Sequence, residues 1–246
     1  MIVTPIRTKV FKEGDDLFAF IAHYFKKLTE KSVVVVTSKI IALAEKRTAV
    51  VGNAKIKEKL IKQESDFALP TKHVWMTLKD RMIMASAGID ESNARGKFVL
   101  LPKDSFKTAQ LLRKKLQQKY GIRNLGVLVT DSRTAPLRSG VTGVALGYAG
   151  FRGIKDYKGQ KDIFGRKFKF SSVDVADSLA TAAVLVMGEG REQQPLALIQ
   201  DAPVKFCEKI YPKELNVAIQ DDIYIPLFSK LAKIKRSISP IRDKNI

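Results

Sequence analysis

The chain has 246 residues, 45% of them hydrophobic and 28% charged, which is enough apolar chain to bury the core of one large or two small domains. Its 44 Lys and Arg residues outnumber 25 Asp and Glu residues, and the formal charge of +19 favours anionic partners such as nucleotides, nucleic acid or acidic substrates. One Cys excludes an internal disulfide, and with only two His residues a Cys and His zinc site is excluded too, so a metal site would need oxygen ligands, as Mg²⁺ and Mn²⁺ prefer.

The N-terminal part of the sequence predicts a strand and then a helix. The strand is expected over Ile2–Arg7, and the helix follows Asp15 and Asp16, each a suitable N-cap. Apolar residues then recur at helical spacing, at Leu17, Phe20, Ile21, Tyr24, Phe25 and Leu28. We therefore expect this stripe to be part of the core.

A strand-to-helix junction follows at Ser38. The run Ser32–Ser38 is apolar and β-branched, as in a buried strand, and the segment KIIALAEK directly after it starts a short helix. Ser38 and Lys39 therefore lie where free backbone N–H groups and the positive end of a helix dipole suit a phosphate. A serine that only caps the helix explains the same pattern.

A polar cluster comes after the next predicted elements, which are a basic helix over Ala54–Gln63 and a strand of small residues from Met82 into Gly88. The cluster consists of Asp90, Glu91, Ser92 and Asn93. Such side chains cannot enter a core without partners. They form either a capped turn, for which Asp, Ser and Asn are well suited, or part of a binding site.

The stretch LGVLVTDSRTAPLRSG carries the strongest indication of a site. A helix expected over Thr108–Tyr120 leads into a buried strand, Leu125–Thr130, and Asp131 follows at its C-terminal end. Ligands of open α/β sheets bind outside the carboxyl ends of strands, and the residues after Asp131 include Ser132, Arg133 and Arg138. This combination predicts a site for a metal ion and phosphates. The alternative is a loop in which Asp131 caps an Asx-turn and the arginines are solvated.

The C-terminal third predicts a loop up to Lys161, a helix and a last strand. The helix is expected over Val173–Met187, with Gly188 as its C-cap and the carboxylate of Glu189 directly after it. Its inward-facing residues are predicted to be Val173, Ala176, Ala180, Ala183, Val184 and Met187. A strand is expected over Pro195–Gln200, and from Lys230 onward almost all charges are positive. We therefore expect one domain over 1–229 and a basic tail over 230–246.

Several motifs are absent. The sequence has no GxxxxGK[ST] segment, so a P-loop is excluded, and the glycines at 143, 147 and 150 do not open a helix as a dinucleotide fingerprint must. No apolar run approaches the roughly 18 residues of a membrane span, and the N-terminus lacks the apolar core of a signal peptide. We expect a cytoplasmic protein that has no membrane partner.

Taken together, these motifs make the chain similar to the gamma-glutamyl ligases that elongate the deazaflavin coenzyme F-420. The matching segments follow the family's order over about residues 5–202 and include GDDL, VVVVTSKI, SAGIDESN, VLVTDSRTAPLRSG, GVALGYAG and VADSLATAAVLVMGEG. The most specific are AGIDESN and the segment from TDS to PLRSG. The resemblance implies a mixed α/β, non-P-loop glutamyl ligase fold, an intertwined homodimer, and a groove that binds GTP and two divalent ions, Mn²⁺ or Mg²⁺.

The resemblance also implies roles for particular residues. Asp90, Asp131 and Ser132 match metal-binding positions, and Glu189 is the best candidate for the remaining ligand. Asn93 matches a guanine-nucleotide position, and further nucleotide contacts are implied for Ser38, Lys39 and an N-terminal turn of Lys9, Val10, Phe11 and Lys12. Two departures stand out, because Leu43 replaces a lysine that commonly binds nucleotide in the family, and KVFK replaces a turn that contains Pro.

The implied activity is ligation of L-glutamate to an anionic acceptor at the expense of an NTP. The acceptor carboxylate becomes an acyl phosphate, and Arg133 and Arg138 are suited to hold the migrating phosphoryl group or a substrate carboxylate. The leading acceptor is the lactyl-phospho-deazaflavin precursor. One alternative is a paralogue that adds glutamate to the end of a protein or peptide, such as a ribosomal component, supported by Leu43 and the positive charge. The other is an RNA- or ribosome-binding module on a catalytically idle scaffold.

Overall fold

The computed structural model describes residues 1–224 and 226, so the predicted basic tail from Lys230 lies outside the described residues. The chain divides into a large unit, Met1–Glu214, and a small unit that begins at Leu215. The described part of the small unit contains a 3₁₀ turn, η2 (Ile219–Asp221). All the other elements belong to the large unit.

The large unit is built on a mixed five-stranded sheet. Its strands lie in the order β1 (Ile2–Ile6), β12 (Leu196–Gln200), β2 (Ser32–Thr37), β8 (Leu125–Arg133) and β9 (Thr142–Ala149). β2 and β8 pair in parallel, whereas the other neighbouring strands are antiparallel. The central strands β2 and β8 are buried on both faces, as their unbroken apolar runs predict.

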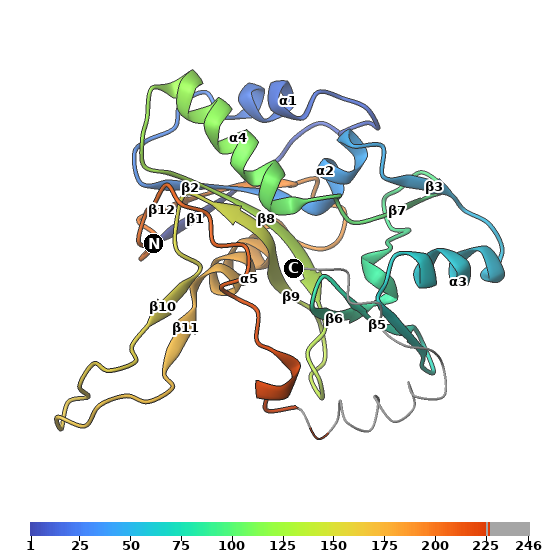
Figure 1. Ribbon diagram of the computed structural model, residues 1–246. Helices are drawn as coiled ribbons and strands as arrows, with labels where there is room; N and C mark the ends of the chain where they lie inside the picture. Colours follow the sequence, from blue (N-terminus) through green and yellow to red (C-terminus); the bar gives the residue numbers. More distant parts are fainter. Residues whose placement is uncertain (225, 227–246) are drawn as a thin grey trace. The chain divides into compact units, whose positions relative to one another are not determined.

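Helices cover both faces of this sheet, as Figure 1 shows. α1 (Leu17–Tyr24), α2 (Ser38–Ala44) and α4 (Ser105–Tyr120) lie on one face, where Phe20, Ile41, Leu112 and Val127 share one core cluster. α5 (Val175–Met187) lies on the other face. Asp16, Asp104 and Asp174 cap α1, α4 and α5, each accepting a hydrogen bond from a backbone N–H of the first turn. The prediction of a mixed α/β class is confirmed.

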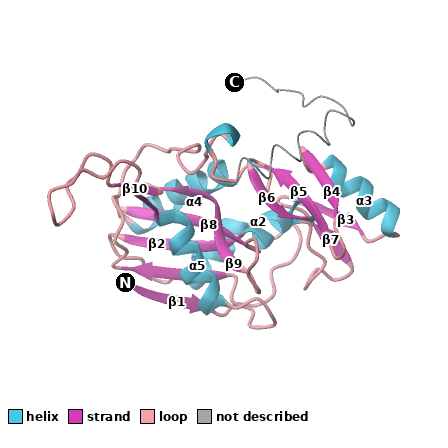
Figure 2. Ribbon diagram, turned by 90° about the horizontal axis from the view of Figure 1, so that it is seen from below, coloured by secondary structure: helices cyan, strands magenta, loops and turns pink. Residues whose placement is uncertain are grey.

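A smaller group of elements follows α2 in the chain and lies together in Figure 2. It contains α3 (Ala54–Gln63), the pair β3 (Thr48–Val50) and β7 (Lys97–Val99), and an antiparallel sheet of β4 (Phe67–Pro70), β5 (Trp75–Lys79) and β6 (Met82–Ala85). The 3₁₀ turn η1 (Ser86–Gly88) follows β6. Its separate core consists of Ile61, Ala87, Ile89, Phe98 and Leu100.

Some predicted bounds were wrong. β8 continues beyond Thr130 to Arg133 because it forms a hairpin with β9, and its register shifts between Val129 and Thr130. β10 (Ile154–Asp156) and β11 (Ser172–Asp174) pair where a loop and the start of a helix were expected. Val173 is therefore 44% exposed in β11 and does not face the interior. Strands of three residues are too short to show a sequence period.

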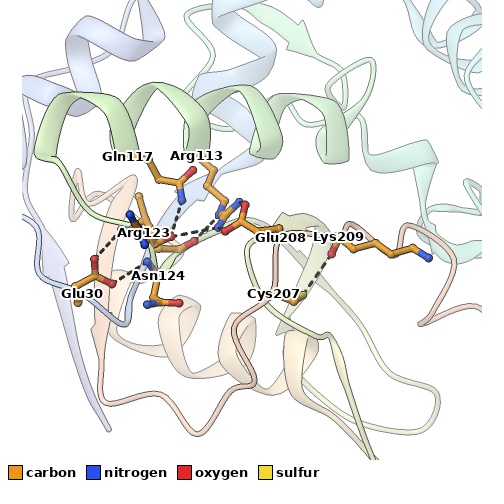
Figure 3. Close-up of polar contacts among 9 residues, drawn as sticks. Glu30, Arg113, Gln117, Arg123, Asn124, Cys207, Glu208 and Lys209 are labelled. Atoms are coloured by element: carbon orange, nitrogen blue, oxygen red, sulfur yellow. Dashed lines mark hydrogen bonds and ion pairs between the residues drawn. The ribbon is translucent and has the colours of Figure 1, made fainter.

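Polar contacts fix the turn between α4 and β8 (Figure 3). The buried Arg113 of α4 donates to the Leu125 carbonyl oxygen at 2.7 Å and forms a bidentate pair with Glu208, at 2.8 and 2.7 Å. The Glu30 carboxylate accepts from the backbone N–H groups of Arg123 and Asn124, at 2.7 and 2.8 Å. The chain therefore enters β8 along a fixed path. Over the described residues, no helix is long and apolar enough to cross a membrane.

Candidate functional site

The site lies where the parallel strands β2 and β8 leave their pairing. Thr37, the last residue of β2, pairs with Thr130 of β8, so Ser38 and Asp131 both come directly after this pair. The Ser38 side chain is close enough to the Asp131 carboxyl to lower its pKa. The sequence prediction that both residues lie at the carboxyl edge of the sheet is confirmed in position, although β8 itself continues past Asp131.

Asp131 carries a perturbed carboxyl group. Burial raises the pKa of Asp131 to about 7, against the opposing effect of hydrogen bonds from the Ser132 backbone and the Ser38 side chain. The negative charges of Asp90 and Glu189 raise this pKa further. Electrostatic effects of this kind fall off with distance, so Asp90 and Glu189 each lie within electrostatic range of Asp131.

Asp90 lies in a network with Lys39, at the start of α2. Its Oδ2 atom is 2.5 Å from the Lys39 ammonium, and its two oxygens accept from the backbone N–H and the hydroxyl of Ser92, at 2.7 and 2.8 Å. The Lys39 ammonium also donates to the Ser92 carbonyl oxygen at 3.0 Å. Although burial raises the pKa of Asp90, hydrogen bonds from Lys39 and Ser92 lower it overall. Asp90 is therefore an anion held by one cation.

Glu189 enters the site from the end of α5. The Gly188 C-cap, at φ +80°, ends the helix, and the next residue directs its carboxylate to the Ser132 hydroxyl, which donates to Oε2 at 3.2 Å. One residue further, the Gly190 carbonyl oxygen accepts from the Asn93 side-chain amide at 3.1 Å. The segments that carry Asn93, Ser132 and Glu189 thus meet.

The types of donor atom at this site suit a hard cation, but their arrangement in this structure does not. Carboxylate and hydroxyl oxygens of Asp90, Asp131, Ser132 and Glu189 are the ligand types that Mg²⁺ and Mn²⁺ take. Within residues 1–224 and 226, however, no group of three His, Cys, Asp or Glu side chains is arranged to hold one metal ion. In this conformation Asp90 is paired with the Lys39 ammonium instead. Shared coordination would require this ion pair to open.

The two predicted arginines have different surroundings. Arg133, next to Ser132 on β8, pairs with Asp177 of α5 at 3.2 Å, and the other Asp177 oxygen accepts from the Ala145 backbone N–H at 2.9 Å. Arg138 lies in the exposed loop between β8 and β9. Only Arg133 is therefore attached to the elements that carry the site.

The N-terminal turn, residues 9–12, is held in place mainly through hydrogen bonds of its backbone. Phe11 is buried against Phe20 in the core, with ring centroids 4.9 Å apart, whereas Val10 is 47% exposed. The backbone N–H groups of Lys9 and Lys12 donate to the Tyr24 hydroxyl and the Asp15 carboxylate. The turn itself follows Thr8, whose N–H donates to the Gln193 carbonyl oxygen in the loop after Glu189.

Leu43, the unusual residue of α2, is partly buried and packs against an apolar cluster of Ala42, Ala94 and Val99. A lysine at this position would bring a charge to that cluster.

Sequence reasoning missed two polar residues that support the site, Ser92 and Asp177. Ser92 belonged to a recognised polar cluster, and Asp177 stands in the first turn of α5, where an acid is usually explained by the helix dipole.

Comparison with known proteins decides the family. A family model described as F420-0:Gamma-glutamyl ligase matches residues 5–201. The chain belongs to this family. The F420-0:gamma-glutamyl ligase match spans every residue of the candidate site, and it confirms the resemblance found in the sequence.

Several curated relatives of this ligase family are named coenzyme F420:L-glutamate ligase. The protein of Methanopyrus kandleri is 31% identical over 217 residues, covering 80% of this chain and 84% of the relative. That of Methanococcus maripaludis strain C7 is 40% identical over 146 residues, covering 59% of this chain and 58% of the relative. That of Methanothermobacter thermautotrophicus is 43% identical over 122 residues, covering 49% of this chain and 48% of the relative. The chain thus spans little more than half the length of several of these relatives.

Proposed function

We propose that the chain is an NTP-dependent glutamate ligase, with GTP favoured as the nucleotide. It would join L-glutamate to the carboxylate of the deazaflavin coenzyme precursor through an acyl phosphate. The observation that supports this most is that Asp90 pairs with Lys39 at the start of α2 and that the hydroxyl of Ser132, next to Asp131, binds Glu189, in a chain of this ligase family. The names of the relatives supply the substrate classes.

The proposed reaction has two bond-forming steps. In the first, an oxygen of the acceptor carboxylate attacks the γ-phosphorus of the NTP, and the bond to the β-phosphate oxygen breaks, releasing NDP. In the second, the glutamate nitrogen attacks the acyl carbon, phosphate leaves with the bonding electron pair, and the nitrogen loses its proton. Because phosphoryl transfer depends on positioning and charge neutralisation, the cationic side chains have the main role.

Lys39 and Arg133 are the cations of this chain that we assign to those anions. Lys39 already binds one carboxylate in the site and is next to Ser38, so its ammonium is placed to meet a phosphate. Arg133 keeps one guanidinium nitrogen on Asp177, and its side chain is 40% exposed, which leaves donors for a carboxylate or a phosphoryl oxygen. Arg138, on the exposed loop, is assigned the same role.

We assign Asp90, Asp131, Ser132 and Glu189 to Mg²⁺ or Mn²⁺. A bound divalent ion would neutralise phosphate charge and orient the γ-phosphate. Lys39 must then release Asp90, which makes its ammonium available for the nucleotide. Isothermal titration of Mn²⁺ into the full chain should show binding that weakens in Asp131→Asn and Glu189→Gln. Unchanged binding in both variants would contradict the assignment.

We also propose that the chain forms a homodimer. The segment between β10 and β11 exposes three large apolar side chains, Ile163 at 91%, Phe164 at 89% and Phe170 at 86%. Apolar groups exposed so completely are usually covered in an assembly. Light scattering of the full chain should give a mass of about twice 27.4 kDa, and Phe164→Lys should lower it towards the monomer. A monomeric wild type would contradict this proposal.

The activity itself is tested by phosphate release from GTP that depends on glutamate, Mn²⁺ and the deazaflavin precursor. We expect Asp131→Ala and Asp90→Ala to abolish it. Glu58→Ala is the control, since it removes an exposed acid of α3 that pairs with Lys62. Wild-type turnover in both site variants would refute the site, and absence of precursor-dependent turnover in the wild type would refute the acceptor.

One alternative keeps the reaction and changes the acceptor to the carboxyl end of a protein or peptide. The observation that favours it is Leu43, whose apolar packing differs from the lysine common in the family. Mass spectrometry of cellular proteins incubated with the ligase would show glutamyl additions. The RNA-binding alternative relied on the overall charge and on a tail outside the described residues, so it stays a prediction.

A further inference from the structure

A cleft of about 310 Å³ lies directly beside Glu189. Its walls are the start of β9 with the residue before it and the C-terminal half of α5. The residues that matter for its chemistry are Val141, Gly143, Thr181, Val184, Leu185 and Glu189. The volume is at the lower end of the range of small-molecule sites, about 300 to 1,000 Å³.

The floor of the cleft is rigid because β9 and α5 touch through their backbones. A Cβ atom on Gly143 would lie 2.3 Å from the Ala180 carbonyl oxygen, so only glycine permits this approach. The Thr181 hydroxyl donates to the Gly143 carbonyl oxygen at 2.8 Å, which fixes the strand against the helix. Gly143 also pairs with Ser132, whose hydroxyl binds Glu189. The cleft and the candidate site are therefore continuous.

The residues that line the cleft disfavour two of the three proposed substrates, the nucleotide and glutamate. No Lys or Arg is among the described residues that line the cleft, and Glu189 is its one charged side chain. Triphosphate groups and both carboxylates of glutamate need cations, so they would be repelled here. Aliphatic surface is available instead, since Leu185 is 81% exposed and Val141 is 46% exposed. Such a surface suits an uncharged, mainly apolar group.

We propose that this cleft binds the uncharged part of the acceptor, leaving the acceptor carboxylate outside the cleft, on the side of Lys39 and Arg133. The inference rests on the proposed ligase function and assigns the acceptor to a place that the motifs do not mark. It makes Val141, Val184 and Leu185 determinants of acceptor specificity. Nucleotide and glutamate would bind outside the cleft, on the side of Lys39 and Arg133.

The test is Val184→Trp, which fills the cleft, compared with Val186→Trp, which places the same ring on the next exposed part of α5 outside the lining. Isothermal titration would measure three ligands with the full chain: the deazaflavin precursor, the same deazaflavin without its phospholactyl group, and GTP. We expect Val184→Trp to weaken both deazaflavins by about tenfold or more, with GTP affinity unchanged. Val186→Trp should bind all three as the wild type does.

Leu185→Ala provides a second variant, because truncating an exposed side chain leaves the fold intact. It should weaken deazaflavin binding about threefold to tenfold and raise KM for the precursor without changing kcat. Wild-type deazaflavin affinity in both cleft variants would overturn the inference, as would a changed oligomeric state in Val184→Trp with acceptor binding intact. Deazaflavin binding that depends on the cleft but gives no glutamate-dependent turnover would uphold the inference and refute the proposed function.

Discussion

The carboxylate of Glu214 is expected to be among the most important single groups for stability. Its side chain is 9% exposed and accepts hydrogen bonds from the Tyr148 hydroxyl at 2.9 Å, the Gly153 backbone N–H at 2.6 Å and the Arg152 guanidinium at 2.8 Å. Tyr148 is only 1% exposed, so its hydroxyl cannot turn to water if Glu214 is lost. Glu214 therefore joins the end of β9 to the segment that follows it.

We expect Glu214→Ala to lower the free energy of unfolding by about 3 kcal/mol. Leaving a buried donor without a partner costs roughly 1 to 3 kcal/mol, and this applies to the Tyr148 hydroxyl. Breaking a fully buried ion pair costs about 3 to 5 kcal/mol, but Arg152 is 36% exposed and regains water, so its share is smaller. Glu214→Gln should cost less, about 1 to 2 kcal/mol, because the amide oxygen still accepts.

Urea unfolding at pH 7, followed by circular dichroism, measures these values. A double-mutant cycle of Glu214→Ala with Tyr148→Phe isolates the hydroxyl, and the double variant should lose less than the sum of the single variants. Glu58→Ala is the control, since its carboxylate is exposed and should change stability by less than about 0.5 kcal/mol. A loss below about 0.5 kcal/mol for Glu214→Ala would refute the reasoning.

Three further predictions concern other polar groups of the large unit. Thr130→Val should raise the free energy of unfolding by about 1 kcal/mol in urea, because the Thr130 hydroxyl is fully buried and has no hydrogen-bond partner among the described residues. Burial raises the pKa of Glu64, but hydrogen bonds from Lys79 and a neighbouring arginine lower it overall, so its stabilisation is present above pH 4.5 and is lost as the pH falls through the lowered value. Thermal melts from pH 7 to pH 3 should therefore fall less steeply for Glu64→Gln, and parallel curves would contradict this. Asp177→Asn should reduce kcat for GTP-dependent ligation by releasing Arg133. Its free energy of unfolding should change by about 1 kcal/mol or less, because the pair is only partly buried and the amide oxygen can still accept from the Ala145 N–H. Unchanged kcat with normal folding would show that Asp177 does not position Arg133.

The sequence predicted the parts of the site that follow from local pattern. Because β2 and β8 are unbroken apolar runs, parallel pairing places Ser38 and Asp131 at one edge, and the structure confirms this position. The approach of Asp90 and Glu189 could not be derived in the same way, because it depends on the packing of a 3₁₀ turn and on the end of α5. Before the structure, only the resemblance to the ligase family indicated that these acids belong to one site.

The errors have physical causes too. The start of α5 was placed at Val173, since the helical spacing of apolar residues extends into β11, but Asp174 caps the helix and separates the two elements. The continuation of β8 past Asp131 was missed because polar residues in an exposed hairpin resemble a loop. In both cases pairing with another strand overrides the local pattern.

The charges in the site bear on the cationic ligand that we propose for it. The negative charges of Asp90 and Glu189 act on Asp131, and Lys39 is the cation that pairs with Asp90. Burial is the main cause of the raised pKa of Asp131, and the two neighbouring negative charges raise it further. A divalent cation would reverse this effect and free Lys39 for a phosphate. The two negative charges that add to the raised pKa of Asp131 are also charges that the metal ion we propose would neutralise.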